Sequence, residues 1–277
     1  MEWLTLPLSF PFMRDAVLIG AMIALPAGML SCFLVLRGWS LMGDAVSHAV
    51  LPGVVLAYVA GLPLLLGAFA AGLGCAALTG WLQDNSRVKQ DTVLGVVMSG
   101  MFGLGVVLYT SIRSDLHLDH ILFGNMLGIG PEDLRTSAAI SAVVGLALLL
   151  KWRDLALLAF DPVQARVAGL QVGLLNQALL AMVAATVVAM LSAVGIILAV
   201  ALLIAPGAVA FLVTRRLSAM LAVAVLVAGL GSISGVWASF WLDSAPAPTI
   251  VLVLTALFVL AFVHRNLATR RARSPQA

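Results

Sequence analysis

Residues 194–213 read VGIILAVALLIAPGAVAFLV, which is 20 consecutive residues without one charged side chain. A membrane-spanning α-helix needs about 20 predominantly apolar residues, so this stretch is long enough to cross a bilayer. Eight further apolar runs are separated by short breaks that contain turn residues and charges. They cover residues 15–36, 45–61, 62–83, 92–112, 136–150, 174–191, 218–241 and 248–264. These runs are too long and too uniformly apolar for barrel strands, which predicts an all-α polytopic bundle of membrane helices.

The composition excludes an ordinary soluble protein. The 277 residues are 62% hydrophobic and 10% charged, whereas soluble domains contain about 25% charged residues. Little chain remains outside the runs, so we expect a single transmembrane domain over residues 1–277. The run 45–61 is short and opens with polar groups, which leaves eight or nine spans. Residues 1–14 lack the features of a cleavable signal peptide, so the first span is expected to be retained.

The basic residues orient the predicted bundle. Eleven of the 15 lysines and arginines lie in four segments, at 87–89, 151–166, 215–216 and 265–273, which fall on one face of the bundle. The positive-inside rule makes that face and the C-terminus cytoplasmic. Nine spans would then place the N-terminus outside, and eight would place it inside. This distribution fits control of topology, so we expect no nucleic-acid partner despite the net charge of +3.

Asp44 and His48 are the polar residues of greatest interest within the apolar part of the chain. They are four residues apart, so on a helix they share one face and could bind the same divalent cation. An ionisable residue inside a membrane is expensive and marks a functional site by default. Alternatively, Asp44 caps a helix at the membrane surface and His48 hydrogen-bonds to it. Two ligands are too few for a selective site, so a metal site would need a second membrane subunit.

The segment at about 152–172 is too long for a simple hairpin between spans. Asp161 suits a helix N-cap, Pro162 the first helical position and Gly169 the C-terminal cap. A short helix is therefore predicted on the cytoplasmic face. Two roles stay open: an amphipathic helix that only tethers two spans, and a docking helix for a soluble subunit.

Three prolines lie in or beside apolar runs, namely Pro26, Pro52 and Pro206, where proline bends or breaks a helix. The segments 50–54 and 204–208 share a Pro-Gly pair, which suggests corresponding broken helices of a transporter repeat. Cys32 and Cys75 lie in apolar stretches and are expected to be buried thiols without a disulfide.

The outer loop carries His117, Asp119 and His120, which could collect divalent cations or contact a partner. A solvated loop without either role is the simpler interpretation of these three side chains.

Enzymatic chemistry fits the sequence poorly. There is no Gly-x-x-x-x-Gly-Lys-Ser/Thr motif, so ATP hydrolysis by this chain through that mechanism is excluded. No His-Glu-x-x-His motif occurs, and adjacent residues such as Ser47 and His48 point about 100° apart on a helix and cannot form a dyad. The rival transport hypothesis is a self-sufficient secondary transporter of divalent cations, coupled to protons or sodium. Such a carrier usually needs additional buried acids, which this sequence places mostly in loops.

Four segments carry a resemblance to a known family. They are GDAVSHAVLPG at 43–53, ILFGNMLG at 121–128, FDPVQARVAG at 160–169, and the stretch from Val194-Gly195-Ile196-Ile197-Leu198 to Pro206. In this order they resemble the membrane permease subunit of bacterial manganese, iron and zinc ABC importers, and most of all the manganese and chelated-iron branch. The resemblance covers nearly the whole chain from about Phe12.

The resemblance implies a complex in the bacterial inner membrane. Its partners would be a second permease subunit, identical or homologous, cytoplasmic ATP-binding subunits and an external metal-binding protein. It makes Asp44 and His48 the transit site of the ion, and it makes the loop at Asp161, Ala165 and Gly169 the coupling element against the ATPase. The transported ion would be Mn²⁺ or Fe²⁺, towards which Leu51-Pro52-Gly53 leans, while the ligands would not forbid Zn²⁺. No permanently bound cofactor is implied.

Overall fold

The computed structural model describes residues 6–112 and 126–273, and this part of the chain is helical without strands. A short 3-10 helix, η1 (Pro7–Ser9), precedes the first long helix. The α-helices are α2 (Pro11–Leu36), α3 (Met42–Val59), α4 (Leu64–Asn85), α5 (Gln90–Ser111), α7 (Pro131–Phe160), α8 (Pro162–Val167), α9 (Val172–Val213), α10 (Leu217–Trp241) and α11 (Pro246–Arg273). The predicted all-α polytopic bundle is confirmed.

Each of the nine predicted runs falls on one of these helices. Among the described residues, eight segments are long and apolar enough to cross a membrane, and the short run at 45–61 is one of them, as Met42–Val59. The predicted run 136–150 belongs to α7, which is not one of the eight. Its 30 residues carry charges at both ends, and α7 packs against α2 and α9. Its first turn contains Glu132 and Asp133, and Lys151 and Arg153 lie in its last ten residues.

Helix α9 is two spans joined at Gly195, whose φ of 78° is outside the helical range. The chain reverses there. Asn176, in the first half, accepts a hydrogen bond from Arg37 at the end of α2, and Phe211, in the second half, lines a pocket with Leu36 at the same place. Ala189, six residues before Gly195, instead accepts a hydrogen bond from Ser137 near the start of α7. The two ends of α9 therefore lie together beside the end of α2, and the reversal at Gly195 lies away from them. Glycine tolerates this φ, whereas a residue with a Cβ would be strained.

Small residues allow α2, α10 and α11 to pack closely in antiparallel pairs. A Cβ at Gly28 would lie 2.8 Å from the Val225 Cα, and one at Gly20 would lie 3.0 Å from the Ser232 Cβ. The pairing continues to the helix ends, where the rings of Phe10 and Phe240 are 5.7 Å apart. Such small-residue contacts are typical of membrane helices, because lipid offers no hydrophobic driving force for helix association.

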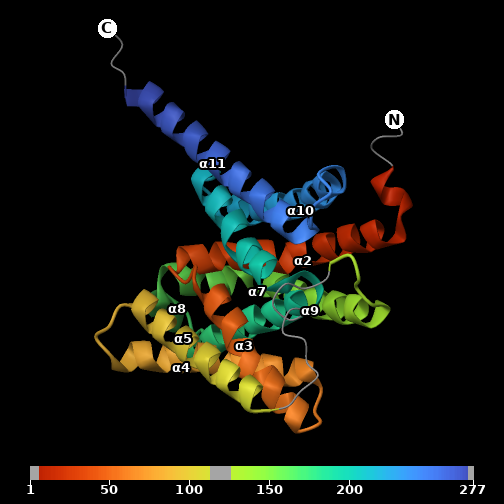
Figure 1. Ribbon diagram of the computed structural model, residues 1–277. Helices are drawn as coiled ribbons and strands as arrows, with labels where there is room; N and C mark the ends of the chain where they lie inside the picture. The colour runs from red at the N-terminus through yellow and green to blue at the C-terminus, as the bar shows by residue number, and fades with distance from the viewer. Residues whose placement is uncertain (1–5, 113–125, 274–277) are drawn as a thin grey trace.

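One end of the bundle gathers the basic segments. Figure 1 shows the α4–α5 connection, α8 and the C-terminal part of α11 on one side, and the start of α2 on the other. On the side of α8 and the α4–α5 connection, Arg265 of α11 donates a hydrogen bond to the carbonyl oxygen of Leu212 at 2.7 Å. Leu212 is followed closely in the chain by Arg215 and Arg216, so these arginines lie on the same side. We call this side the basic end.

The three prolines do not break their helices. Pro26 and Pro52 lie inside α2 and α3, and Pro206 lies inside the second half of α9, eleven residues after the reversal at Gly195, contrary to the expected broken segments. The shared Pro-Gly pair instead marks close helix crossings. A Cβ at Gly53 would lie 2.1 Å from the Gly67 oxygen of α4, and one at Gly207 would lie 2.4 Å from the Ser31 oxygen of α2.

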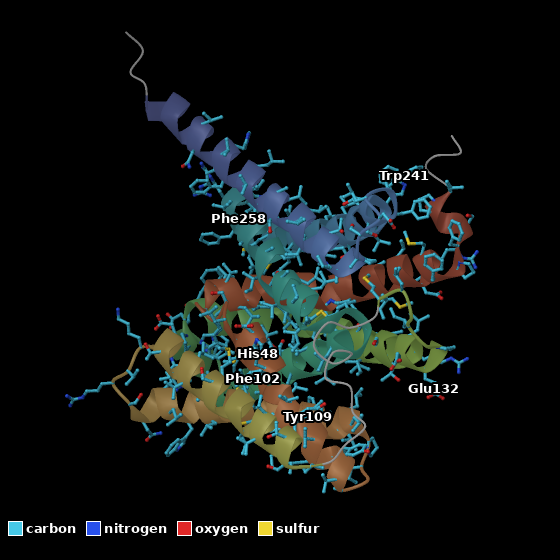
Figure 2. The ribbon with its side chains drawn as sticks, viewed as in Figure 1. His48, Phe102, Tyr109, Glu132, Trp241 and Phe258 are labelled. Carbon is cyan, nitrogen blue, oxygen red and sulfur yellow. The ribbon has the colours of Figure 1, made fainter. Side chains whose placement is uncertain are left out.

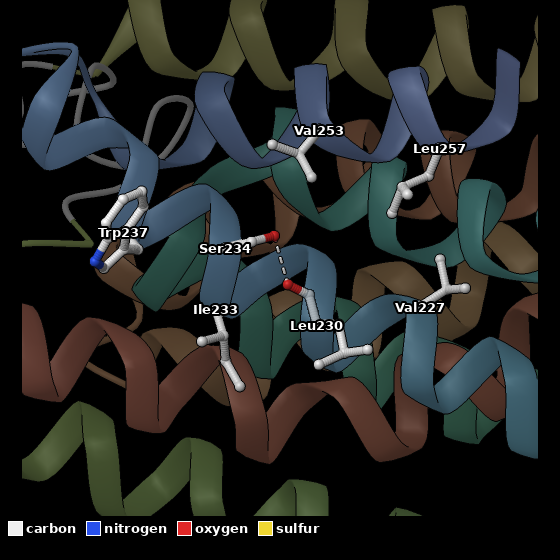
Figure 3. A pocket seen from close by; sticks show the side chains of 7 residues that line it. All are labelled: Val227, Leu230, Ile233, Ser234, Trp237, Val253 and Leu257. Atoms are coloured by element: carbon white, nitrogen blue, oxygen red, sulfur yellow. Dashed lines mark hydrogen bonds between the residues drawn. The ribbon is translucent and has the colours of Figure 1, made fainter. Parts of the chain in front are cut away.

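The outer surfaces between helices are apolar, as expected for a lipid-facing bundle. A groove of about 590 Å³ between α10 and α11 is lined by Val227, Leu230, Ile233, Ser234, Trp237, Val253 and Leu257. Its hydroxyl group, on Ser234, donates to the carbonyl of Leu230 at 2.6 Å, as Figure 3 shows. Cys32 and Cys75 are free thiols and both are buried, as the sequence predicts.

Candidate metal site

Helix α3 begins in the interior of the bundle. Its Ala45 carbonyl accepts a hydrogen bond from Cys75, and Gly72 packs against Val46, so the first turns of α3 lie level with residues 72–76. Those residues are the middle of the 22-residue α4. At 1.5 Å per residue, the start of α3 is roughly 15 Å from either end of α4. Any side chain in the first turns of α3 is therefore deep in the bundle.

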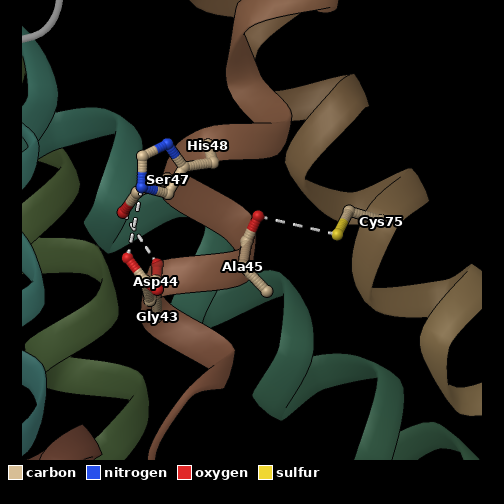
Figure 4. Close-up of polar contacts among 6 residues, drawn as sticks. All are labelled: Gly43, Asp44, Ala45, Ser47, His48 and Cys75. Carbon is tan, nitrogen blue, oxygen red and sulfur yellow. Dashed lines mark hydrogen bonds and ion pairs between the residues drawn. The ribbon is translucent and has the colours of Figure 1, made fainter. Parts of the chain in front are cut away.

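Asp44 and His48 occupy those turns and lie on one helical face. The Asp44 Oδ1 and His48 Nε2 atoms are 3.4 Å apart, and their side chains are 30% and 31% exposed. Figure 4 shows both groups projecting from α3 on the side away from Cys75. Asp44 is in the first turn of α3, where the helix dipole favours a negative charge. The predicted pair is thus present at mid-depth of the bundle, with both side chains partly exposed.

The spacing suits a shared cation better than a strong hydrogen bond. Good N–H···O hydrogen bonds are about 2.7–3.2 Å long. Two ligands that each lie about 2.1 Å from one ion at a near-tetrahedral angle are about 3.4 Å apart. The pair could therefore bind an ion without moving. Among residues 6–112 and 126–273, no group of three or more His, Cys, Asp or Glu residues could hold a metal ion, so this pair alone is an incomplete coordination shell.

Besides Asp44, an aromatic ring from another helix contacts the His48 imidazole. Phe102 of α5 meets it edge-on, with ring centroids 5.3 Å apart and an interplanar angle of 83°; Figure 2 shows the two side chains together. The His48 Nδ1 atom is buried, and no described residue accepts or donates a hydrogen bond there. Pro52 has no amide hydrogen, so the His48 carbonyl lacks its usual helical donor. Phe102 has no signal in the sequence, since it is one more aromatic residue in an apolar run.

Ser47 takes no part in the site. Its buried hydroxyl donates to the Gly43 carbonyl at 2.7 Å, one turn earlier on α3. The hydroxyl therefore has no geometry for a dyad with His48, as its position next to His48 in the sequence predicts.

A second polar contact anchors the turn before α3. Arg37 donates to the Asn176 Oδ1 of α9 at 2.5 Å, and its guanidinium lies 4.0 Å from the centroid of the Trp39 ring. Burial lowers the pKa of Arg37, although an arginine stays protonated. These contacts tie the α2–α3 turn to the first turns of α9, which follow α8 in the chain.

The short helix predicted after the fifth run is α8, with the expected caps. The Asp161 carboxylate accepts from the Val163 and Gln164 amides at 2.9 Å each. At the other end, Leu170 donates to the Ala165 carbonyl and Gly169 to that of Arg166, with Gly169 at φ 81°. This is a Schellman motif, which favours glycine. Ala165 is fully buried, whereas Val163 and Val167 are 68% and 84% exposed, so α8 presents an apolar outer face.

His117, Asp119 and His120 lie outside the described residues. Their expected roles stay predictions.

The fold and the paired donors define a polytopic membrane protein with a candidate cation site at mid-depth. The model of the ABC 3 transport family matches residues 9–265, and the chain belongs to this family. It is 49% identical to the chelated iron transport system membrane protein YfeD of Yersinia pestis, over 94% of this chain and 88% of that protein. It is 41% identical to the manganese transport system membrane protein MntB of Synechocystis, over 95% and 86%.

A solved structure agrees. A chain of PsaBC from Streptococcus pneumoniae, in complex with Fab, superposes with a TM-score of 0.83 at 32% identity, covering 94% of both chains. The comparisons confirm the family-level resemblance of the sequence motifs.

Proposed function

We propose that this chain is the permease subunit of an ATP-driven importer that moves a divalent transition metal ion inward. The observation that carries the proposal is the Asp44–His48 pair, with 3.4 Å between its donor atoms at mid-depth of a membrane bundle. Carboxylate and imidazole donors suit manganese, iron and zinc. The relatives are manganese and chelated-iron transport proteins, which favours manganese or iron as the transported metal. The metal would enter the site either as the free ion or after release from a chelate.

A second permease subunit, identical or homologous, would complete the site. The outer face of α5, beside Phe102, has room for another helix: a Cβ at Gly95 or Gly103 would meet nothing within 4 Å, and Ser99 between them is exposed. Residues of this size at four-residue spacing let membrane helices approach closely. Two chains paired along α5 would bring two Asp44–His48 pairs towards one axis and supply four ligands.

A cytoplasmic ATP-binding subunit would dock on α8. The exposed apolar side chains of Phe160, Val163 and Val167 project at the basic end of the bundle, which the positive-inside rule places in the cytoplasm together with the C-terminus. Asp161 and Gly169 keep α8 folded, while buried Ala165 fixes it to the permease. Movement of the ATPase pair would push on α8, rotate the bundle and change access to Asp44 and His48. An external metal-binding protein would deliver the ion from the opposite side.

The test is uptake of radioactive manganese, iron and zinc, in competition, by cells that lack their own importers. We expect Asp44→Ala with His48→Ala to abolish uptake at normal expression. Ser47→Ala, which removes a hydroxyl bonded only to its own helix, is the matched control and should transport normally. Wild-type uptake by the double variant would remove the assigned route.

A proton- or sodium-coupled secondary carrier is separated by a second measurement. Apart from Asp44, the described carboxylates lie in loops or within two turns of helix ends at the bundle surface. We expect an ATPase to co-purify with the chain and vanadate to stop uptake. Uptake that persists without any ATPase would establish the carrier instead.

A further inference from the structure

A pocket of about 330 Å³ lies at the basic end, where α2, α7, α9, α10 and α11 meet. Three of its lining residues are arginines from two segments, Arg215 and Arg216 in the α9–α10 turn and Arg265 of α11. In the described part of the chain, no carboxylate forms an ion pair with Arg215 or Arg216, and both are exposed. The pocket therefore has a strong positive potential.

Helix ends of both polarities reach the pocket, because the C-terminal ends of α2, α7 and α9 meet the start of α10 there. Arg216 is the N-cap of the 25-residue α10, with no side chain capping the helix, and Arg216 and Leu217 both line the pocket, so the uncapped, electropositive start of α10 favours an anion there. Arg265 donates to the carbonyls of Phe211 and Leu212 and thereby holds α11 against the end of α9. The arginines thus sit on a rigid junction of helices.

The apolar surroundings indicate the kind of anion. Apolar side chains also line the pocket, among them Leu217, Met220 and Phe160. On α11, Phe258 and Phe262 precede Arg265 by seven and three residues and so share its helical face, and they are 37% and 50% exposed. A charged pocket that continues into an apolar helix face matches a phosphate headgroup with acyl chains, and basic pockets between membrane helices at the cytoplasmic side are typical sites for anionic lipids.

We propose that this pocket binds the phosphate headgroup of an anionic phospholipid of the adjacent leaflet. The lipid would stabilise the junction from which α8 projects, because Phe160 lines the pocket and directly precedes Asp161, the N-cap of α8. Anionic lipid would then set how firmly α8 is held against the bundle. The membrane placement of the basic end rests on the proposed function, whereas the identity of the transported ion does not enter.

The experiment is lipid retention by the full-length chain, purified with its partner subunits and titrated with phosphatidylglycerol under native mass spectrometry. Removing one basic residue near an anionic surface weakens binding about fivefold. Removing both arginines, in Arg215→Gln with Arg216→Gln, should therefore weaken retention about 30-fold. The control is Arg87→Gln, an exposed arginine of the α4–α5 connection outside the pocket, which should retain lipid like the wild type. Phosphatidylcholine should be retained equally weakly by all three proteins.

Further arms separate the other occupants. Inorganic phosphate at millimolar concentration should not displace the lipid; if it does, the pocket is an anion site without lipid selectivity and the proposal is overturned. Unchanged lipid retention with loss of the co-purifying ATPase would assign the pocket to an acidic side chain of that subunit instead. An equal loss in Arg87→Gln would reduce the effect to general surface charge. Because lipid retention is measured without transport, a failed uptake experiment would leave this result standing.

Discussion

His48 contacts a carboxylate and an aromatic ring, and these two neighbours have different roles. Asp44 lies 3.4 Å from its Nε2 atom and provides the charge, while the edge-on ring of Phe102 limits the orientation of the imidazole without competing for the ion. A polar residue at position 102 would offer a further ligand and hold the ion more firmly. Because Phe102 is apolar and adds no donor, the further ligands of the ion would come from the second permease subunit.

Replacing Phe102 by alanine should slow transport without removing it. An aromatic pair of this geometry contributes about 0.5–1.5 kcal/mol, so a His48 ring that loses this support should reduce uptake about 2- to 12-fold. The measurement is the initial rate of manganese uptake at matched expression. Leu104→Ala is the control, since Leu104 is 49% exposed two residues away on α5. Equal losses in both variants would argue against a specific role for the ring.

Among the helices, the crossing of α3 and α4 fixes the depth of the site. Gly67 and Gly53 face each other so closely that a Cβ on Gly67 would lie 2.2 Å from the Gly53 oxygen. Gly67→Ala should therefore force the helices apart at a cost of about 1–3 kcal/mol and lower the melting temperature of the purified complex by about 2–10 °C. Gly80→Ala, on the same helix with open space around it, should have no such effect. A normal melting temperature for Gly67→Ala would show that the crossing yields easily.

Helix α8 offers a test of docking. Val167→Asp places a charge on the most exposed apolar side chain of α8. If an ATPase buries this residue, the variant should weaken its co-purification about 5- to 30-fold, which is the usual range for a central interface residue. Gln164→Glu adds the same charge on an exposed polar position of α8 and should leave binding intact. Undiminished ATPase binding by Val167→Asp would favour the simple tether.

What the sequence predicts depends on how local the determining contacts are. The caps of α8 lie within ten residues, from Asp161 to Leu170, so their residue types predict the helix and both ends correctly. The Asp44–His48 spacing predicts a shared face for the same reason. The depth of that face depends on contacts with Gly67, Gly72 and Cys75 of another helix, and Phe102 reaches His48 only because α5 packs beside α3. The prolines mislead because their helices continue through tertiary packing.

At the scale of the whole molecule, the antiparallel packing of α2 and α10 bears on the number of spans. The ring of Phe10 before α2 contacts Phe240 near the end of α10, whereas Cys32 contacts Met220 near the start of α10. Because α10 starts directly after Arg215 and Arg216, the basic end is also where α2 ends. If the basic end is cytoplasmic, the N-terminus is external, and an odd number of crossings follows with a cytoplasmic C-terminus. Helix α7 must then be the ninth span, despite the charges at its ends.

This topology predicts which single cysteines react with a membrane-impermeant maleimide in intact cells. In a background with Cys32→Ala and Cys75→Ala, the exposed positions Ser9→Cys and Glu132→Cys should be labelled directly, because they precede α2 and start α7 at the external side. Ser86→Cys and Gln164→Cys should be labelled only after permeabilisation. Two results together would establish eight crossings. Ser9→Cys would be labelled only after permeabilisation, and Glu132→Cys and Gln164→Cys would be labelled from the same side of the membrane. The bundle would then enclose α7 without carrying it across the bilayer.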